Sequence, residues 1–163
     1  MSTSARNTNP MLSGLGPAAY ADRAMVPDLT VDGDPKVVPL RSVPSFFLEP
    51  RDPDPRGMAV VGADGITAGT VADVWVDRSE PQLRYFEVSL GGSGRIVLLP
   101  ASMARVNARQ AIVKVSSILA SQFADVPQPA RNDQITLREE DQVMAYYAAG
   151  HLYRTPDRRE PFL

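Results

Sequence analysis

The pattern of hydrophobic and polar residues changes near residue 57, and the two parts of the chain predict different structures. In residues 1–56, apolar residues stand singly or in short runs between prolines, and nine of the 15 prolines fall here. Proline lacks a backbone N–H and restricts the residue before it, which argues against regular helix or central strand. Apolar anchors still recur through this stretch, unlike in most disordered linkers. Residues 1–56 are therefore predicted to form an extended arm that docks along its own domain or a partner.

From Gly57 onward, short apolar or alternating segments are separated by turn residues, as is typical of β-strands. The predicted strands cover residues 58–61, 67–77, 83–90, 95–99, 104–106 and 111–115. Gly69 is expected to permit a bend or bulge in the second of them, and Trp75 is expected in the core. No helical pattern separates these strands, so residues 57–130 are predicted to form a small antiparallel β-barrel and the fold class to be mainly β.

A single helix is predicted in the last part of the chain, residues 131–163. Thr136 and Glu139 have the spacing of a capping box, and acidic residues fill the first turn, where the helix dipole favours negative charge. An apolar stripe follows at Val143, Met144, Tyr146 and Tyr147. Gly150 is expected to end the helix. The charged tail after it, residues 154–163, is expected to be extended.

Composition excludes several classes of function. The chain has 17 Lys and Arg against 19 Asp and Glu, a net charge of −2, which argues against a generally basic nucleic-acid binder. It has no Cys and one His, His151, so disulfides, cysteine metal sites and multi-histidine sites are excluded within one chain. No apolar run approaches the ~20 residues of a membrane-spanning helix. The chain alone is therefore expected to be soluble, on the cytoplasmic side.

An enzyme is not expected, because no nucleophile and base or metal-ligand set can be assembled from these residues. The most suggestive charged group is Asp77, Glu80 and Arg84, which span the end of one predicted strand, a turn and the start of the next. Two carboxylates on one rim, moderated by an arginine, can carry protons when their pKa values are shifted. From spacing alone, solvated charges on a hairpin are the simpler interpretation.

Several strings of residues, in order along the chain, carry a family resemblance. They are residues 16–20, 26–29, 35–40, 68–77, 78–88, 97–100, 117–127, 135–141 and 145–150. Together they resemble the H subunit of the photosynthetic reaction centre, both in its PRC-barrel and in the arm that precedes the barrel. The resemblance covers roughly residues 14–156.

The resemblance implies a non-catalytic subunit that is peripheral to the cytoplasmic face of the bacterial photosynthetic inner membrane. Such a subunit stabilises the L and M subunits and assists proton delivery to the secondary quinone. It binds no cofactor itself; bacteriochlorophyll, bacteriopheophytin, quinones and non-haem iron are expected in the partner subunits. Contacts with light-harvesting proteins are also implied. Apart from the resemblance, the arginines of the charged tail are candidates for contact with anionic lipid, and the charge balance predicts no nucleic-acid partner.

The resemblance also implies roles for individual residues. Glu80 is assigned as the relay acid, Asp77 as its partner and Arg84 as the residue that tunes their electrostatics. Well-known members of the family carry two histidines near the position of Asp32 and Asp34, at the mouth of the proton pathway. This chain has carboxylates there, so Asp32 and Asp34 are weaker candidates for proton uptake.

The chain departs from the family pattern at its beginning, where the family has a transmembrane helix. Two explanations stay open: a split gene, with a separate transmembrane H-type polypeptide supplying the anchor, or a truncated form of a longer chain. The split is the expectation favoured here. A second functional hypothesis also stays open, namely a binding module of a ribosome-maturation factor or another assembly factor. PRC-barrels occur in a ribosome-maturation factor that binds a ribosomal protein.

Overall fold

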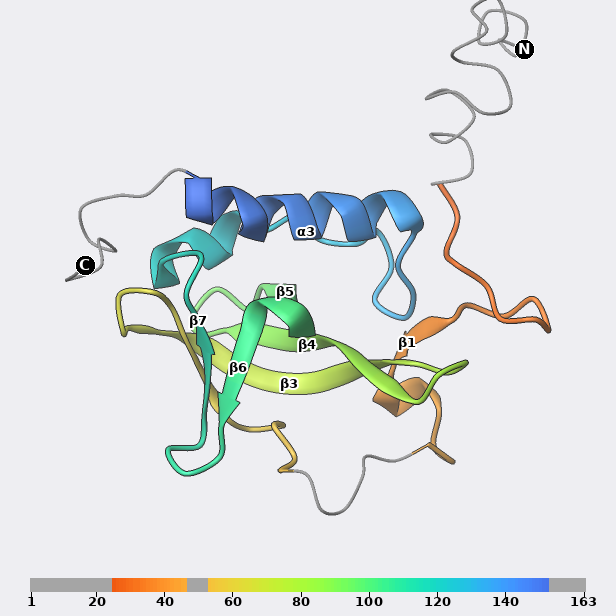
Figure 1. Cartoon of the computed structure of the whole chain (residues 1–163), viewed down its shortest axis with the longest axis horizontal. Coiled ribbons are helices and arrows are strands. Elements are labelled where there is room, and N and C mark those ends of the chain that lie inside the picture. Colours follow the sequence, from red (N-terminus) through yellow and green to blue (C-terminus); the bar gives the residue numbers. More distant parts are fainter. Residues whose placement is uncertain (1–24, 47–52, 153–163) are drawn as a thin grey trace, which may run out of the picture.

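The computed structural model describes residues 25–46 and 53–152 (Figure 1). Residues 1–24 and 47–52 of the predicted arm lie outside the described residues, as does the whole of the predicted tail, residues 154–163. Strands lie below one long helix, and the segment that contains β1 runs along one side of the sheet (Figure 1).

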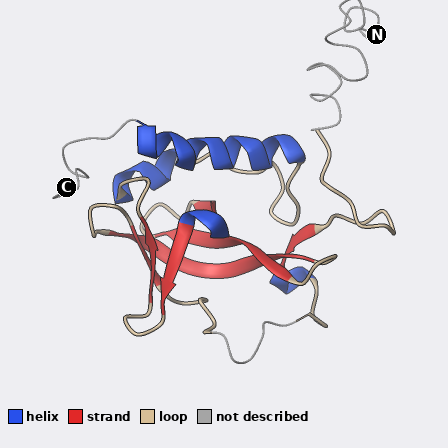
Figure 2. Cartoon of the chain, in the orientation of Figure 1, coloured by secondary structure: helices blue, strands red, loops and turns tan. Residues whose placement is uncertain are grey.

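The strands form one sheet, which confirms the prediction of a mainly β fold with one C-terminal helix (Figure 2). Its hydrogen-bonded order is β5-β4-β3-β2-β7-β6, and β1 pairs separately with β3. The strands are β1 Val37–Pro39, β2 Ala59–Val61, β3 Thr67–Asp77, β4 Gln82–Leu90, β5 Ile96–Pro100, β6 Ala104–Asn107 and β7 Ile112–Val115. Short 3-10 helices are η2 Leu40–Ser42, η3 Ala101–Met103 and η4 Ala120–Asp125, and the long helix is α3 Leu137–Leu152.

The sheet is mixed rather than wholly antiparallel, and it is not closed. β2 and β7 run parallel, while every other pair is antiparallel within the described residues. A parallel pair needs a long crossover between its strands, and here β3 to β6 supply it. Turn residues in the sequence predict hairpins between strands that are consecutive in the chain, so they do not predict the pairing of β2 with β7. The result is a barrel-like fold with β5 and β6 at the ends of the sheet order.

The irregularity expected at Gly69 is present. The register of β2 against β3 shifts between Val60, opposite Gly69, and Val61, opposite Thr67. A Cβ on Gly69 would lie 2.2 Å from the carbonyl oxygen of Ser89, so only glycine permits this approach of β4.

Part of the segment predicted as an arm belongs to the sheet. β1 pairs with the end of β3, and Val37, Val38 and Leu40 are buried against the barrel. Pro39 is compatible with this strand because β1 lies at an edge, where a ladder donor can be missing. The apolar residues of this segment are therefore part of the core rather than side chains of a linker.

Helix α3 covers one face of the sheet and begins with the predicted capping box (Figure 1). The Glu139 N–H donates to Thr136 Oγ1 at 3.1 Å, and the Thr136 N–H donates to Glu139 Oε1 at 2.9 Å. Val143 and Tyr147 are fully buried, one helical turn apart. The Tyr147 hydroxyl donates to the Leu98 carbonyl at 3.0 Å, which fixes the helix to β5.

Two details of the predicted helix are wrong. Gly150 does not end it, because α3 continues to Leu152. A Cβ on Gly150 would lie 1.9 Å from the Ser117 carbonyl oxygen, so this glycine serves close packing of the helix on the chain after β7. Met144 is partly exposed rather than part of the buried stripe. Trp75, in contrast, lies in the core as predicted.

Candidate functional site

Asp77 closes β3 and organises the turn that follows it. The residue is buried, with 5% of its surface exposed. Its Oδ1 accepts the Ser79 N–H at 2.8 Å and the Glu80 N–H at 3.2 Å. A carboxylate that accepts backbone N–H groups two and three residues ahead stabilises a tight turn. The Asp77 carboxylate is therefore a structural acceptor as well as a negative charge at the rim.

Arg84, near the start of β4, lies between two carboxylates. Its Nη1 is 3.7 Å from Asp77 Oδ2, and its Nη2 is 2.7 Å from Glu140 Oε1. The second contact is a charge-assisted hydrogen bond, and the first is a looser ion pair. The predicted association of Asp77 with Arg84 is thus present, and Arg84 also joins the hairpin to helix α3.

Glu140 is a member of this cluster that sequence reasoning treated only as a first-turn acid. Its Oε1 also accepts the Tyr85 hydroxyl at 2.9 Å. Burial raises the pKa of the Glu140 carboxyl, although hydrogen bonding by Tyr85 and the charge of Arg84 oppose that rise. Burial, aided by the Glu140 charge, raises the pKa of Tyr85 as well. Glu140 is 56 residues from Arg84 in sequence, so no spacing rule brings them together.

Glu80 lies in the turn between β3 and β4 and is exposed. Its side chain makes no ion pair with any residue that the structure describes. Of the three predicted rim residues, Glu80 is thus the one whose carboxylate faces solvent, while Asp77 and Arg84 are engaged.

Asp32 and Asp34 are exposed in a separate turn of the arm and do not contact Asp77, Glu80 or Arg84 within the described residues. The Thr30 N–H donates to the Asp34 carbonyl at 2.8 Å and closes this turn.

The arm around that turn is hydrogen-bonded to α3 and to the rim, by which we mean Asp77, the β3–β4 turn and Arg84. The Arg78 guanidinium donates to the Pro35 carbonyl, and the Arg78 N–H donates to the Lys36 carbonyl at 2.9 Å. Earlier in the arm, the Val26 carbonyl accepts the Leu137 N–H at 3.0 Å. Residues 26–37, the β3–β4 turn and the start of α3 therefore form one continuous surface.

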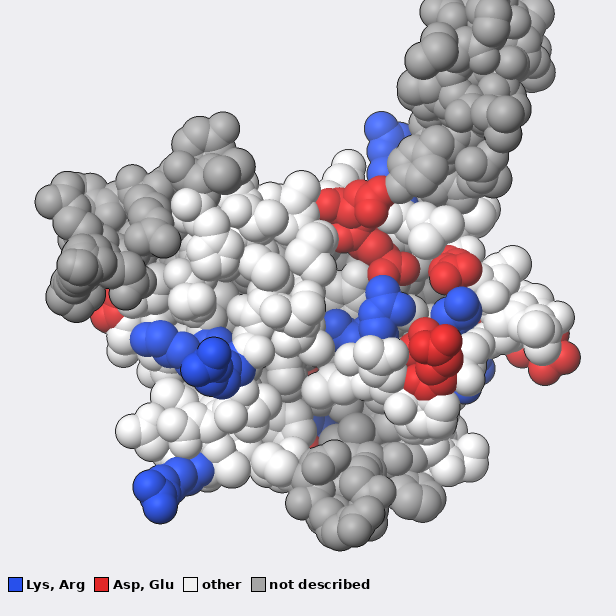
Figure 3. Space-filling model, in the orientation of Figure 1, with Lys and Arg blue, Asp and Glu red and all other residues white. Residues whose placement is uncertain are grey.

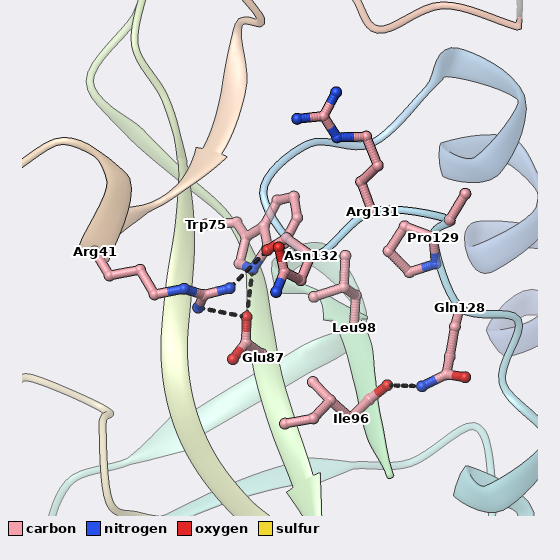
Figure 4. Close-up of a pocket in the computed structure, with 10 residues that line it drawn as sticks. Arg41, Trp75, Glu87, Ile96, Leu98, Gln128, Pro129, Arg131 and Asn132 are labelled. Atoms are coloured by element: carbon pink, nitrogen blue, oxygen red, sulfur yellow. Dashed lines mark hydrogen bonds and ion pairs between the residues drawn. The ribbon is translucent and has the colours of Figure 1, made fainter.

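A second charged cluster, which the sequence did not indicate, lies deeper in the sheet (Figure 4). Arg41 Nη1 contacts Asp73 Oδ2 at 3.0 Å and Glu87 Oε1 at 2.8 Å. The Trp75 Nε1–H donates to the same Glu87 oxygen at 2.9 Å, and Arg41 Nη2 donates to the Asn132 carbonyl at 2.6 Å. The register of β3 and β4 places Asp73 opposite Glu87, and Arg41 from η2 neutralises part of their charge.

This second cluster forms one wall of a pocket of about 290 Å³ between the sheet and the loop before α3. Ile96 and Leu98 line it from β5, and Gln128 and Pro129 line it from the loop (Figure 4). Residues 73–77 of β3 and 85–88 of β4 are buried without alternation. No sequence pattern indicated that η2 brings an arginine to Asp73 and Glu87.

Two family profiles match this chain, in consecutive stretches. The photosynthetic reaction centre H-chain N-terminal region matches residues 3–42, and the PRC-barrel domain matches residues 49–120. The two matches support an H-subunit-like or PRC-barrel protein. The first match supports membership of a reaction-centre complex associated with a membrane, and the second agrees with the barrel-like sheet. Among the described residues, no helix has the length and hydropathy that crossing a bilayer requires.

Proposed function

We propose that this chain is an H-type subunit of a bacterial photosynthetic reaction centre, bound to the L and M subunits at the cytoplasmic face. The match of residues 3–42 to the H-chain N-terminal region carries this proposal. A PRC-barrel alone would equally suit an assembly factor of another kind. The order of the two matches, arm before barrel, favours the reaction-centre assignment.

The continuous surface made by the arm, the β3–β4 turn and the start of α3 supports a docking role. The isolated β-bridge between Pro27 and Thr136 and the Arg78 contacts fix these three segments to one another. A partner that binds the rim would also contact the arm. Stabilisation of the L/M core then follows from a rigid, preassembled surface rather than from a single contact.

We propose that the rim also assists proton delivery to the secondary quinone held by the partner subunits. Glu80 acts as the relay acid, because its carboxylate is exposed and no described residue neutralises it. Asp77 shapes the turn that presents Glu80, and Arg84 moderates the repulsion between the carboxylates. Contact with a partner would remove the Glu80 carboxylate from bulk water.

Glu140 enters this proposal as a positioning residue. Its hydrogen bond with Arg84 Nη2 holds the guanidinium within reach of Asp77. Because burial raises the pKa of the Glu140 carboxyl, the charge near Arg84 changes closer to neutral pH than that of a solvated glutamate.

In this proposal the chain is not an enzyme and binds no pigment or metal itself. Bacteriochlorophyll, bacteriopheophytin, quinones and non-haem iron belong to the partners. Anionic lipid and light-harvesting proteins are further contacts in this proposal.

The experiment replaces Glu80 by Gln in the native complex and follows the proton-coupled second electron transfer by flash absorption. We expect the rate to fall about tenfold or more, because a positioned acid–base group is lost. The complex should purify with an unchanged subunit content, because Glu80 makes no ion pair within the described chain. The control is Asp125→Asn, an exposed acid at the end of η4, which should leave the rate unchanged.

Unchanged kinetics in the Glu80→Gln complex between about pH 6 and 9 would refute the relay role while leaving the docking role standing. Co-purification of the chain with ribosomes, without L and M, would instead favour the assembly-factor alternative.

A further inference from the structure

A third charged region lies away from the rim, where β6, β7 and the end of α3 meet. A pocket of about 350 Å³ opens here, and its lining is Ser102, Met103, Ala104, Arg105, Lys114, Ser116 and His151. Arg105 comes from β6, Lys114 from β7 and His151 from the last turn of α3. Three elements that are distant in sequence thus bring nitrogen donors to one hollow.

The two cations of the pocket are direct neighbours across the strands. The register of β6 and β7 pairs Arg105 with Lys114. Residues opposite each other in an antiparallel pair have Cβ atoms about 5 Å apart, and like charges in this arrangement destabilise the sheet. A bound anion between them would remove this cost.

No carboxylate of the described chain relieves that repulsion. Neither Arg105 nor Lys114 forms an ion pair with a described residue, and none of the residues that line the pocket is acidic. Figure 3 shows Lys and Arg side chains over β6 and β7 without the mixture of acids and bases that surrounds the start of α3. The sign of the local field is therefore positive at close range.

The remaining lining residues suit an oxyanion. The Ser102 and Ser116 hydroxyls border the pocket and can donate hydrogen bonds, and an arginine guanidinium presents a planar fork to two oxygens of one group. The volume is sufficient for a tetrahedral oxyanion with part of its hydration.

We propose that this pocket, formed by Arg105, Lys114, Ser102, Ser116 and His151, binds a phosphate group. The group belongs either to a small phosphorylated molecule or to a phospholipid head. The proposal does not depend on the reaction-centre assignment, because it uses only residues outside the rim.

The first arm of the test titrates the full chain with inorganic phosphate against chloride at constant ionic strength. Backbone amide resonances of β6, β7 and the last turn of α3 should shift saturably, and the thermal midpoint should rise. Arg105→Gln and Lys114→Gln should each weaken phosphate binding at least about tenfold, the loss of one charge-assisted hydrogen bond. The matched control is Arg109→Gln, in the exposed β6–β7 turn and outside the pocket lining, which should change the affinity less than about twofold.

Lys114→Glu provides a variant whose folding is not at risk. It replaces the repulsive cross-strand pair by an attractive one, so the thermal midpoint without phosphate should rise while the response to phosphate disappears. A midpoint that falls would contradict the repulsion on which the proposal rests.

The second arm separates the two sources of phosphate by sedimentation with vesicles of phosphatidylcholine, with and without phosphatidylglycerol. A lipid head as the ligand predicts binding only to the anionic vesicles, weakened about fivefold by each pocket substitution and not by the control. Binding of inorganic phosphate without vesicle binding assigns the pocket to a small phosphorylated molecule. Failure of both arms, or equal weakening by Arg109→Gln, would overturn the proposal and leave only a diffuse attraction of anions.

Discussion

Replacement of Arg41 by Met tests whether residues of the predicted arm are integral to the barrel. Arg41 Nη1 is 3.0 Å from Asp73 Oδ2 and 2.8 Å from Glu87 Oε1, and the two carboxylate side chains are only 8% and 9% exposed. Without the guanidinium, both carboxylates would remain buried beside each other with no ion-pair partner among the described residues, and only the more distant charge of Arg56 would act on Asp73. Loss of one partner of a fully buried pair costs about 3–5 kcal/mol.

The Arg41 side chain is 44% exposed, so water replaces part of the lost interaction. We therefore expect the free energy of unfolding to fall by about 2–3 kcal/mol. With a urea m-value of about 2 kcal/mol/M, this moves the midpoint of unfolding by about 1–1.5 M. The assay is urea unfolding of the full chain, followed by circular dichroism and by Trp75 fluorescence.

Arg131→Met is a matched control for this prediction. The Arg131 side chain is 61% exposed and forms a 3.0 Å ion pair, but its partner Asp133 is 45% exposed. An exposed pair contributes little, so this variant should lose less than about 0.5 kcal/mol. Adding Glu87→Gln to Arg41→Met should recover part of the lost stability by removing one stranded charge. An Arg41→Met variant no less stable than Arg131→Met would refute the reasoning.

Three further predictions concern helix α3. Glu140→Gln should gain stability relative to the wild type as the pH rises. The pKa of the wild-type carboxyl is higher in the folded than in the unfolded state, so its stabilising contribution is present below the unfolded-state pKa and lost above the folded-state pKa. A pH series of urea melts in which the stability difference between the two proteins stays constant would contradict this. Gly150→Ala should lower the free energy of unfolding by about 2–3 kcal/mol despite the better helix propensity of alanine, because the alanine Cβ would lie 1.9 Å from the Ser117 carbonyl oxygen. An unchanged thermal midpoint would show instead that the helix can shift. Tyr147→Phe should cost about 1 kcal/mol in urea melts, more than Tyr146→Phe, because the Tyr147 hydroxyl is buried; equal losses would argue against that hydrogen bond.

Local patterns in the sequence were enough to predict the elements of this fold. Period-two alternation indicated β3 and β4, and the Thr136 and Glu139 spacing indicated the start of α3. Each of these signals lies within one element, where neighbouring residues decide the backbone conformation.

Features that join distant elements were not predictable in the same way. The parallel pairing of β2 with β7 has no local signature, and Gly150 has the sequence of a helix stop while serving a close approach to Ser117. The site shows the same division. The association of Asp77 with Arg84 follows from a hairpin, whereas the approach of Glu140 depends on how α3 packs on the sheet.

The central claim is that the chain is a reaction-centre H-type subunit, and its isolation from native photosynthetic membranes through an affinity tag tests this most directly. The account predicts that L and M subunits accompany the tagged chain, as identified by mass spectrometry, and that the purified complex shows pigment absorption. Recovery of the chain alone, or with ribosomal proteins and no pigment, would contradict it.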